Sequence, residues 1–305
     1  TRSPFSQHIA VALFGTSLGP LVSEVSFDLG LPVKIGVPLG ILAGVFTGFV
    51  MPVLAKHFYD FHKGYSLYNI GFTSGIIGTF FIAVFRSFGL DVQPVYFVSR
   101  GNNRPLSILL FVLFAVMLLV GLWANGWSLK RYGQLMKEAG KIGEDLVTKY
   151  GHGLVLINMA VLGILSTMYV LLVGGELNGP TIGGILTVVG FGASGKHLKN
   201  VIPLFIGIFL VGHFSVHDTS STAALLAALF GTTLAPLCGY YGPVAGIIAG
   251  GLHIVLTTNL SFLHAGMNLY NNGFSGGFVA ALMVPILDKI LEESQAQDSH
   301  LLSGK

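Results

Sequence analysis

The chain has 305 residues, of which 52% are hydrophobic and only 10% charged, and its mean hydropathy is +0.76. Soluble globular proteins carry about 25% charged residues, so this composition excludes a soluble globular protein and is typical of a multi-pass membrane protein. The net charge of +3 gives no basis for a nucleic-acid partner, and the single cysteine, Cys238, excludes an intrachain disulfide. We expect an integral protein of the lipid bilayer, located in the inner (plasma) membrane of a bacterium.

Ten apolar stretches are long enough to cross, or nearly cross, a bilayer, which takes about 17 to 25 helical residues. Because lipid offers the backbone no hydrogen-bond partners, we expect helices and an all-α, polytopic transmembrane bundle. In chain order the predicted segments are 8–26, 33–56, 68–89, 105–126, 152–174, 181–195, 200–214, 219–238, 241–259 and 269–290.

Two segments are polar. Ser128–Gly151 carries five basic residues, and its apolar residues Leu135, Ile142 and Leu146 follow helical spacing. This pattern predicts an amphipathic helix at the membrane surface, or a solvated linker helix, on the cytoplasmic side. Residues 291–305 are expected to form a frayed polar tail.

Three sequence blocks near the start of the chain are repeated near its end. LFGTSLGP (13–20) matches LFGTTLAP (229–236), GILAG (40–44) matches GIIAG (246–250), and FHKGYSLYNIGFTSG (61–75) matches FLHAGMNLYNNGFSGG (262–277). A chance match among Gly, Ala and Leu would not also reproduce His, Asn and Tyr. We interpret the blocks as an internal repeat within a transmembrane domain over 1–290, with copy A at about 8–89, copy B at about 219–290 and a linking region at 105–217.

The number of crossings between the copies decides their relative orientation. We call the matched stretches 61–75 and 262–277 the polar lines of copies A and B. If 181–195 crosses the membrane, the two polar lines face opposite sides and the repeat is inverted, a plan found in many transporters. Lys196 and Lys199 then lie on the cytoplasmic side, as the positive-inside rule favours. If 181–195 is re-entrant instead, the repeat is parallel. A complete two-fold unit would need about a hundred further residues before Thr1, and the alternative is that the extra helices in the middle of the chain are an insertion.

This pattern resembles the urea-transporter superfamily, whose two inverted halves contain short half-helices. NGPTIGGILTVVGF (178–191) resembles the Asn-Pro-Leu line that opens a broken helix in that superfamily, although Gly179 interrupts the Asn-Pro pair. KGYSLYNIGF and AGMNLYNNGF resemble its Gly-Leu-x-Gly-Tyr-Asn-Gly line, and no clear Asn-Pro-Leu partner exists in copy A. The resemblance implies a similar fold. The chain is also similar to uncharacterised bacterial multi-pass families.

The polar lines supply the candidate solute path. Asn69 and Asn271 each precede an apolar helix, where an Asn side chain can cap free backbone N–H groups. Capping and close glycine packing are therefore one interpretation. The other is that two helix starts, one from each side, meet near the middle of the membrane and line a polar path. The predicted path residues are Tyr68, Asn69, Tyr270, Asn271, Asn272, Asn178 and Glu176.

Ionisable and hydroxyl side chains add further candidates. His62 and His264 match by the repeat and are expected either to gate the path or relay protons, or to be buried, hydrogen-bonded histidines. His213 and His217, four residues apart, with Asp218 are weak metal candidates, because a helix would put both imidazoles on one face. The repeat-matched hydroxyls, usually bonded back to a helix carbonyl, are Thr16, Ser17, Thr232 and Thr233.

Two functional classes fit these features. The first is a channel or secondary transporter for a small polar solute or ion, without a cofactor, metal or enzymatic activity, and with a homo-oligomer as a possible assembly. The second is a flavin-carrying membrane subunit of a redox complex, because the membrane subunits of sodium-pumping quinone oxidoreductases have a similar fold. GFTSG (71–75) and FGASG (191–195) only approach their Ser-Gly-Ala-Thr flavin-attachment line.

Overall fold

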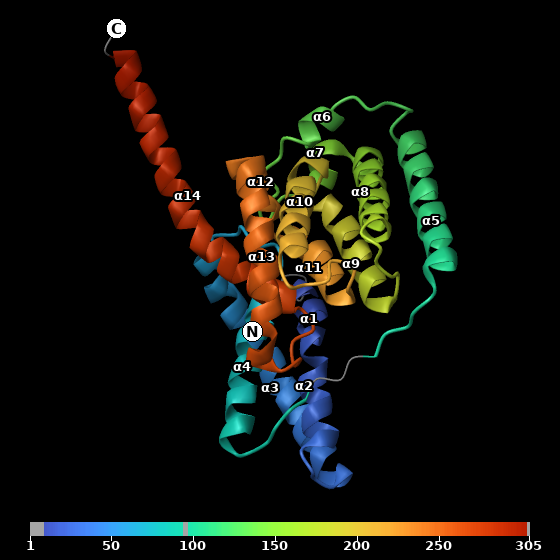
Figure 1. Cartoon of the computed structure of the whole chain (residues 1–305), viewed down its shortest axis with the longest axis vertical. Helices are drawn as coiled ribbons and strands as arrows, with labels where there is room; N and C mark the ends of the chain where they lie inside the picture. Colours follow the sequence, from blue (N-terminus) through green and yellow to red (C-terminus); the bar gives the residue numbers. More distant parts are fainter. Residues whose placement is uncertain (1–8, 94–96, 304–305) are drawn as a thin grey trace.

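The computed structural model describes residues 9–93 and 97–303, and these residues form helices and loops without a strand (Figure 1). The α-helices are α1 (Ile9–Gly15), α2 (Gly19–Ser23), α3 (Val33–His62), α4 (Asn69–Ser87), α5 (Asn103–Ala124), α6 (Tyr132–Leu135), α7 (Leu146–Tyr150), α8 (His152–Leu172), α9 (Gly179–Gly190), α10 (Leu198–Phe214), α11 (Thr222–Gly231), α12 (Ala235–Tyr241), α13 (Pro243–His264) and α14 (Asn271–Ser303). Tighter or wider turns form η2 (Thr16–Leu18), η3 (Glu24–Asp28), η4 (Phe191–Ala193) and η5 (Thr232–Leu234).

Eight helical stretches within the described residues are long and apolar enough to cross a bilayer. Large hydrophobic side chains on them point outward, as on a surface that faces lipid; Phe49 of α3, for example, is 79% exposed. The chain is thus a multi-pass integral membrane protein, as its composition predicts. The two remaining predicted segments are the shorter helices α9 and α10.

The prediction of one amphipathic helix over 128–151 is wrong. The segment contains only the short helices α6 and α7, joined by a loop in which Gly140 and Gly143 have φ of +77° and +98°. A right-handed helix cannot pass through these angles. Leu135 and Leu146 are fully buried against α8, so the segment packs onto the bundle through its own apolar residues.

The C-terminal segment also differs from expectation. We predicted a frayed tail at 291–305, but α14 continues without a break to Ser303. In Figure 1 this helix extends well beyond the bundle.

The two repeat copies have the same order of elements. In copy A a broken helix (α1–η2–α2) is followed by α3 and α4, and in copy B a broken helix (α11–η5–α12) is followed by α13 and α14. α3 and α13 end in the same unusual way, because Lys63 and Ala265 have φ of +50° and +44°. In Figure 1, α4 and α14 leave the middle of the molecule in opposite directions along its long axis.

The linking region forms an outer layer of helices and also packs against copy B. α5 and α8 pack closely, with Gly163 against Phe114, and form the outer layer visible in Figure 1. α9 runs beside α11, since Asn178 contacts Thr222 at one end and Gly184 contacts Leu229 further along. The turn after α9, residues 194–197, carries the linking region into the centre of the protein.

Candidate functional site

The polar line of each copy is buried and is bonded to the helix break of the other copy. The Leu67 backbone N–H donates to the Thr233 carbonyl oxygen at 3.0 Å, and the Leu269 N–H donates to the Ser17 carbonyl oxygen at 3.0 Å. The breaks need such partners, because a 3-10 turn interrupts the regular hydrogen bonds of the helix. The two copies are therefore joined by an exchange of equivalent hydrogen bonds.

The starts of α4 and α14 cross at two glycines. A Cβ built on Gly273 would lie 2.9 Å from the Gly71 Cα, which is closer than side-chain carbons approach in proteins. Each crossing helix then presents a phenylalanine to a glycine of the other: Phe274 to Gly75 and Phe72 to Gly277. The repeated glycines are explained by this close approach.

Five aromatic rings close into a ring, which we call the aromatic collar, beside this crossing. The successive centroid distances are 6.2 Å (Phe14–Phe191), 5.0 Å (Phe191–Tyr68), 6.0 Å (Tyr68–Phe230), 5.8 Å (Phe230–Tyr270) and 5.8 Å (Tyr270–Phe14). Phe14 and Tyr68 belong to copy A, and their repeat equivalents Phe230 and Tyr270 belong to copy B. A cavity of about 20 Å³, large enough for about one water molecule, is lined by four collar residues, all but Phe230, and by Gly71.

Lys196 lies against the collar with its side chain fully buried. Its Nζ donates to the Tyr68 hydroxyl at 2.5 Å and to the Thr232 Oγ1 at 2.7 Å. It also lies 4.6 Å from the ring centroid of Tyr68 and 4.9 Å from that of Phe191, within the range of cation–π attraction. Lys196 is therefore not an exposed loop charge but a central contact between the linking region and both copies, and its expected cytoplasmic side stays a prediction.

Buried amides fix the turn that carries Lys196. The Asn158 Nδ2 donates to the carbonyl oxygens of Gly192 and Lys196 at 2.9 and 2.7 Å. The Asn200 Nδ2 donates to the Gly195 carbonyl oxygen at 2.9 Å, and its Oδ1 accepts from the His197 N–H at 2.9 Å. With both ends of the turn held, the ammonium group has a defined position.

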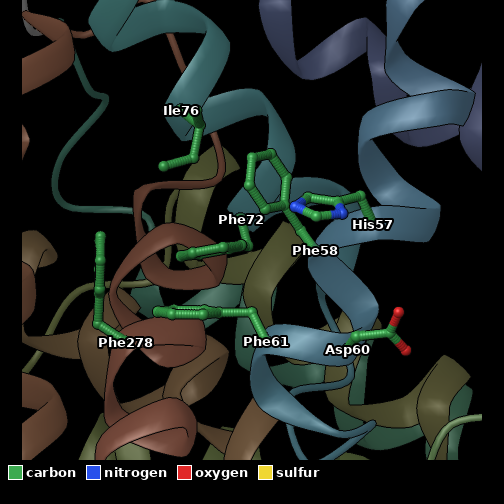
Figure 2. Close-up of a pocket in the computed structure, with 7 residues that line it drawn as sticks. All are labelled: His57, Phe58, Asp60, Phe61, Phe72, Ile76 and Phe278. Carbon is green, nitrogen blue, oxygen red and sulfur yellow. The ribbon is translucent and has the colours of Figure 1, made fainter.

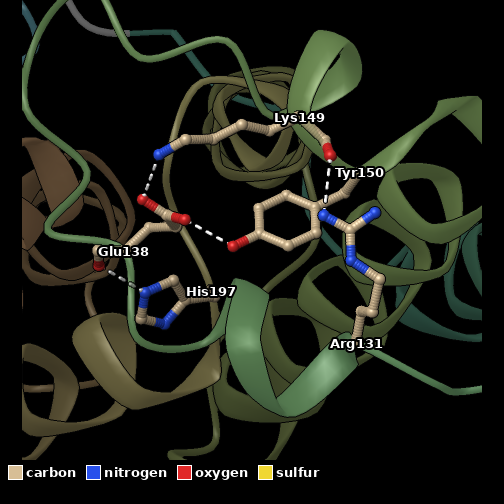
Figure 3. Close-up of polar contacts among 5 residues, drawn as sticks. All are labelled: Arg131, Glu138, Lys149, Tyr150 and His197. Carbon is tan, nitrogen blue, oxygen red and sulfur yellow. Dashed lines mark hydrogen bonds and ion pairs between the residues drawn. The ribbon is translucent and has the colours of Figure 1, made fainter.

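The turn is also connected to the polar surface. In Figure 3 the His197 imidazole points to the Glu138 carbonyl oxygen, at 3.0 Å from Nε2, while the Glu138 carboxylate binds Lys149 and Tyr150. Burial raises the pKa of Glu138, but the hydrogen bonds from Lys149 and Tyr150 outweigh it and hold this pKa below its usual value. Burial raises the pKa of Tyr150 to about 12, and its bond to Glu138 adds to that effect.

The two histidines of the polar lines pair with the two asparagines. The distance from His62 Nε2 to Asn69 Oδ1 is 2.9 Å, and from His264 Nε2 to Asn271 Oδ1 it is 3.0 Å. Because each Asn Nδ2 donates to a carbonyl oxygen of the preceding helix, at Ala55 or Thr257, each Oδ1 must accept, which puts a proton on Nε2.

The capping interpretation of Asn69 and Asn271 is therefore wrong. Neither side chain accepts from a backbone N–H at its helix start; each ties the end of one helix to the start of the next. The neighbouring amide, Asn272, has a different partner: its Oδ1 lies 3.1 Å from His253 Nε2, which also contacts Thr257.

Two predicted path residues lie elsewhere. Asn178 caps α9, accepting from the Thr181 N–H at 3.1 Å, and Glu176 approaches the Gly101 N–H at 3.4 Å near the surface. The 12 residues of α9 place about 18 Å between Asn178 and the collar. Asn178 therefore has the role of a helix cap, away from the polar lines.

The repeat-matched hydroxyls have unequal surroundings. Thr16 and Thr232 both donate back to a carbonyl three residues earlier, at 2.6 Å, but only Thr232 is buried and contacts Lys196. Ser17 donates to the Ser74 hydroxyl at 2.9 Å, and the Thr233 Oγ1 accepts from the Tyr68 N–H at 2.9 Å. The polar contacts of the breaks are thus richer in copy B.

The expected shared face of His213 and His217 is not formed. α10 ends at Phe214, so the two residues are not on one helix; His213 stacks on Phe209, and His217 Nε2 lies 3.2 Å from the Thr258 hydroxyl. Asp218 binds Ser220. No group of three metal-ligating side chains occurs in 9–93 and 97–295.

A second, larger cavity of about 340 Å³ lies at the side of the crossing. Figure 2 shows the rings of Phe58, Phe61 and Phe72 facing it together with Phe278 and Ile76. Only His57 and Asp60 give it polar atoms. It contains none of the buried polar side chains and is an apolar groove between α3, α4 and α14.

Neither line that approaches a flavin-attachment sequence fits that role. Thr73 of GFTSG is fully buried in α4, and its hydroxyl donates to the Asn69 carbonyl oxygen at 3.0 Å. FGASG has a serine but no threonine, and it forms the turn before Lys196. A flavin joined to Thr73 would need a large opening of the helix crossing.

Comparison with known proteins identifies a family. Residues 1–87 and 124–289 match the model of the family described as "Protein of unknown function (DUF1576)", and the chain belongs to this family. The match covers both repeat copies and most of the linking region. No curated protein and no solved structure matches the chain. The resemblance to the urea-transporter superfamily thus rests on the short sequence lines alone.

Proposed function

We propose that this member of the DUF1576 family is a membrane channel or secondary transporter for a small polar solute or ion, and that the solute passes between the two repeat copies at the aromatic collar. The proposal rests on which parts of the chain supply the residues of the collar. Copy A, copy B and the linking region each contribute rings to it, and it encloses a cavity beside the starts of α4 and α14. A passage between two sides of a membrane needs walls of this kind from both halves.

An inverted repeat is part of the proposal. The opposite directions of α4 and α14 in Figure 1, and the reciprocal bonds of Leu67 and Leu269, support it. Two helices that start near mid-membrane turn the positive ends of their dipoles toward a shared centre. Irregular backbone at that depth is tolerated where it is buried in protein or lines a cavity.

The polar side chains around the collar are hydroxyls, amides and one ammonium group, which suit a small polar solute. The collar is narrow in this conformation, because its cavity holds about one water molecule. Passage of a solute therefore requires the rings of Tyr270 and Phe14 to move apart. Such gating by side chains or by one copy moving against the other is common to channels and transporters.

Flux into proteoliposomes tests the proposal. The purified protein is reconstituted, and the entry of urea, glycerol, chloride, acetate and potassium is followed against protein-free vesicles and vesicles with heat-inactivated protein. We expect protein-dependent flux of at least one of these solutes. Protein that is folded and inserted but raises the flux of none of them would contradict a transport function.

A further inference from the structure

The interior of the described chain holds a basic side chain without an acidic partner. Lys196 is fully buried, and its donors reach only hydroxyl oxygens and aromatic rings. The ion pairs among the described residues are Lys63–Asp288, Lys149–Glu138 and Lys289–Glu293, and none includes Lys196.

The rest of the buried polar set does not supply negative charge either. The buried polar residues described are Ser, Thr, Asn, His and this one Lys, with no Asp or Glu among them. A low-dielectric interior strengthens the field of an uncompensated charge. Hydroxyls and aromatic faces are partners that an ammonium group can use, and none of them carries negative charge, so a protonated Lys196 would make the field at the collar positive.

Burying an unpaired charge is costly, and ionisable residues at membrane depth usually mark a path for ions or substrates. The chain nevertheless fixes Lys196 in place through Asn158 and Asn200. The repeat gives an internal comparison: the matching position Thr16 in copy A is exposed and meets no lysine. The linking region thus brings a lysine to the helix break of copy B, at Thr232, and brings none to the matching Thr16 of copy A.

We propose that the solute of this path is a small anion, attracted to the collar by Lys196. The inference rests on the proposed transport function and names its substrate class. Tyr68 and Phe191, the two rings beneath the ammonium group, also line the collar cavity, so an anion there would be near the charge. The start of α4, whose Gly71 lines the same cavity, adds the positive end of a helix dipole. The small cavity favours an anion of few atoms, such as chloride or formate.

The test compares anions with neutral solutes in Lys196 variants. Vesicles containing potassium salts of chloride, nitrate or formate are treated with valinomycin, so that potassium moves freely and the anion limits the flux. Urea and glycerol are measured in parallel. Lys196→Met keeps most of the side-chain volume and removes the charge, and Lys196→Arg keeps the charge. Lys199→Met is the matched control, since Lys199 is exposed three residues away.

We expect the parent to carry at least one anion faster than urea and glycerol. Lys196→Met should lower that anion flux by about tenfold or more, equivalent to about 1.4 kcal/mol of barrier, and leave the flux of neutral solutes unchanged or higher. Lys199→Met should match the parent, and Lys196→Arg should retain more anion flux than Lys196→Met. If Lys196→Met fails to insert, Lys196→Gln gives the same comparison.

Two results would overturn the anion inference and leave transport standing: flux of urea, glycerol or potassium without flux of any anion, or full anion flux in folded Lys196→Met and Lys196→Gln. Absence of flux for every solute would contradict the proposed function itself. The two failures are therefore distinguishable in one set of vesicles.

Discussion

Gly71 and Gly273 meet so closely that a Cβ on Gly273 would lie 2.9 Å from the Cα of Gly71, and this contact holds the starts of α4 and α14 together. The same contact seen from Gly71 places its Cβ 2.9 Å from that of Tyr270 and 3.1 Å from the Gly273 Cα. The neighbours on both sides include backbone, which cannot rotate away. The packing of the two copies therefore depends on the absence of side chains here.

Alanine at either glycine should destabilise the protein. We expect Gly71→Ala and Gly273→Ala each to cost about 1–3 kcal/mol, the usual range for overpacking a close contact. Thermal unfolding in detergent measures the effect. Gly48→Ala is the control, because Gly48 lies in α3 with open space around its Cβ position. Equal melting temperatures for the parent and Gly273→Ala would contradict the described crossing.

Aspartate at the two amides should be destabilising rather than neutral. In Asn69→Asp and Asn271→Asp a carboxylate oxygen replaces the Nδ2 that donates to the carbonyl of Ala55 or Thr257. Losing a half-buried donor and placing a carboxylate oxygen against the carbonyl oxygen, so that two acceptors face each other, should cost about 1–3 kcal/mol.

Thermal unfolding again gives the measurement. Asn259→Asp is the control, since the Asn259 amide makes the same kind of bond, to the Val255 carbonyl at 2.8 Å, but is exposed. A parent-like melting temperature for both Asn69→Asp and Asn271→Asp would show that the amide bonds are dispensable.

The proposed inverted repeat predicts that equivalent turns are exposed on opposite sides of the membrane. Asp28, before α3, and Val244, at the start of α13, occupy matching places in the two copies. In Figure 1 the turn before α3 and the turn before α13 lie toward opposite ends of the molecule. In a Cys238→Ala background, Asp28→Cys and Val244→Cys should react with an impermeant maleimide from opposite sides of sealed vesicles. Lys34→Cys is the control and should react from the Asp28 side. Labelling of Asp28→Cys and Val244→Cys from one side would favour a parallel repeat.

The surface cluster at Glu138 predicts a specific dependence of stability on pH. Its pKa is lowered on folding, so its contribution is complete above the unfolded value of about 4.5 and is lost as pH falls through the folded pKa. Glu138→Gln should therefore unfold at a lower temperature than the parent at pH 7, and the difference should shrink in acid.

The control for this prediction is Glu292→Gln, because Glu292 is exposed on α14. Melting temperatures measured between pH 7 and pH 3 should show a pH-dependent difference for Glu138→Gln alone. A difference that stayed constant over that range would mean that the Glu138 carboxylate does not contribute through its charge.

The sequence was informative where short-range patterns repeat. The matched His62 and His264, Asn69 and Asn271, and the glycines after them form equivalent contacts in the structure, because equal local sequences adopt equal turns. The membrane class and the helical segments follow from hydropathy for a similar reason, since lipid imposes one constraint on every span. What the repeat could not indicate was that each polar line is bonded to the helix break of the other copy.

Long-range packing explains why other features of the candidate site were not predicted from the sequence. The burial of Lys196 was not predicted, because it depends on a turn held by Asn158 and Asn200, whose contacts cannot be inferred from the local sequence. The capping role of Asn69 was inferred from position alone, whereas its real partners belong to the preceding helix. The collar residues Phe14 and Phe230 were missed, although both lie in the matched LFGT blocks and the repeat offered the signal.

The most direct test of the central claim is to obstruct the collar and measure flux. In a Cys238→Ala background, Tyr270→Cys is treated with a small charged methanethiosulfonate, and the modified fraction is determined by mass spectrometry. Lys130→Cys, exposed in the polar segment between α5 and α6, is the matched control, because its thiol is accessible to a charged reagent. An adduct in a cavity of about 20 Å³ should reduce solute flux by about tenfold or more in Tyr270→Cys and leave flux in Lys130→Cys unchanged. Full modification of Tyr270→Cys with undiminished flux would contradict a path through the collar.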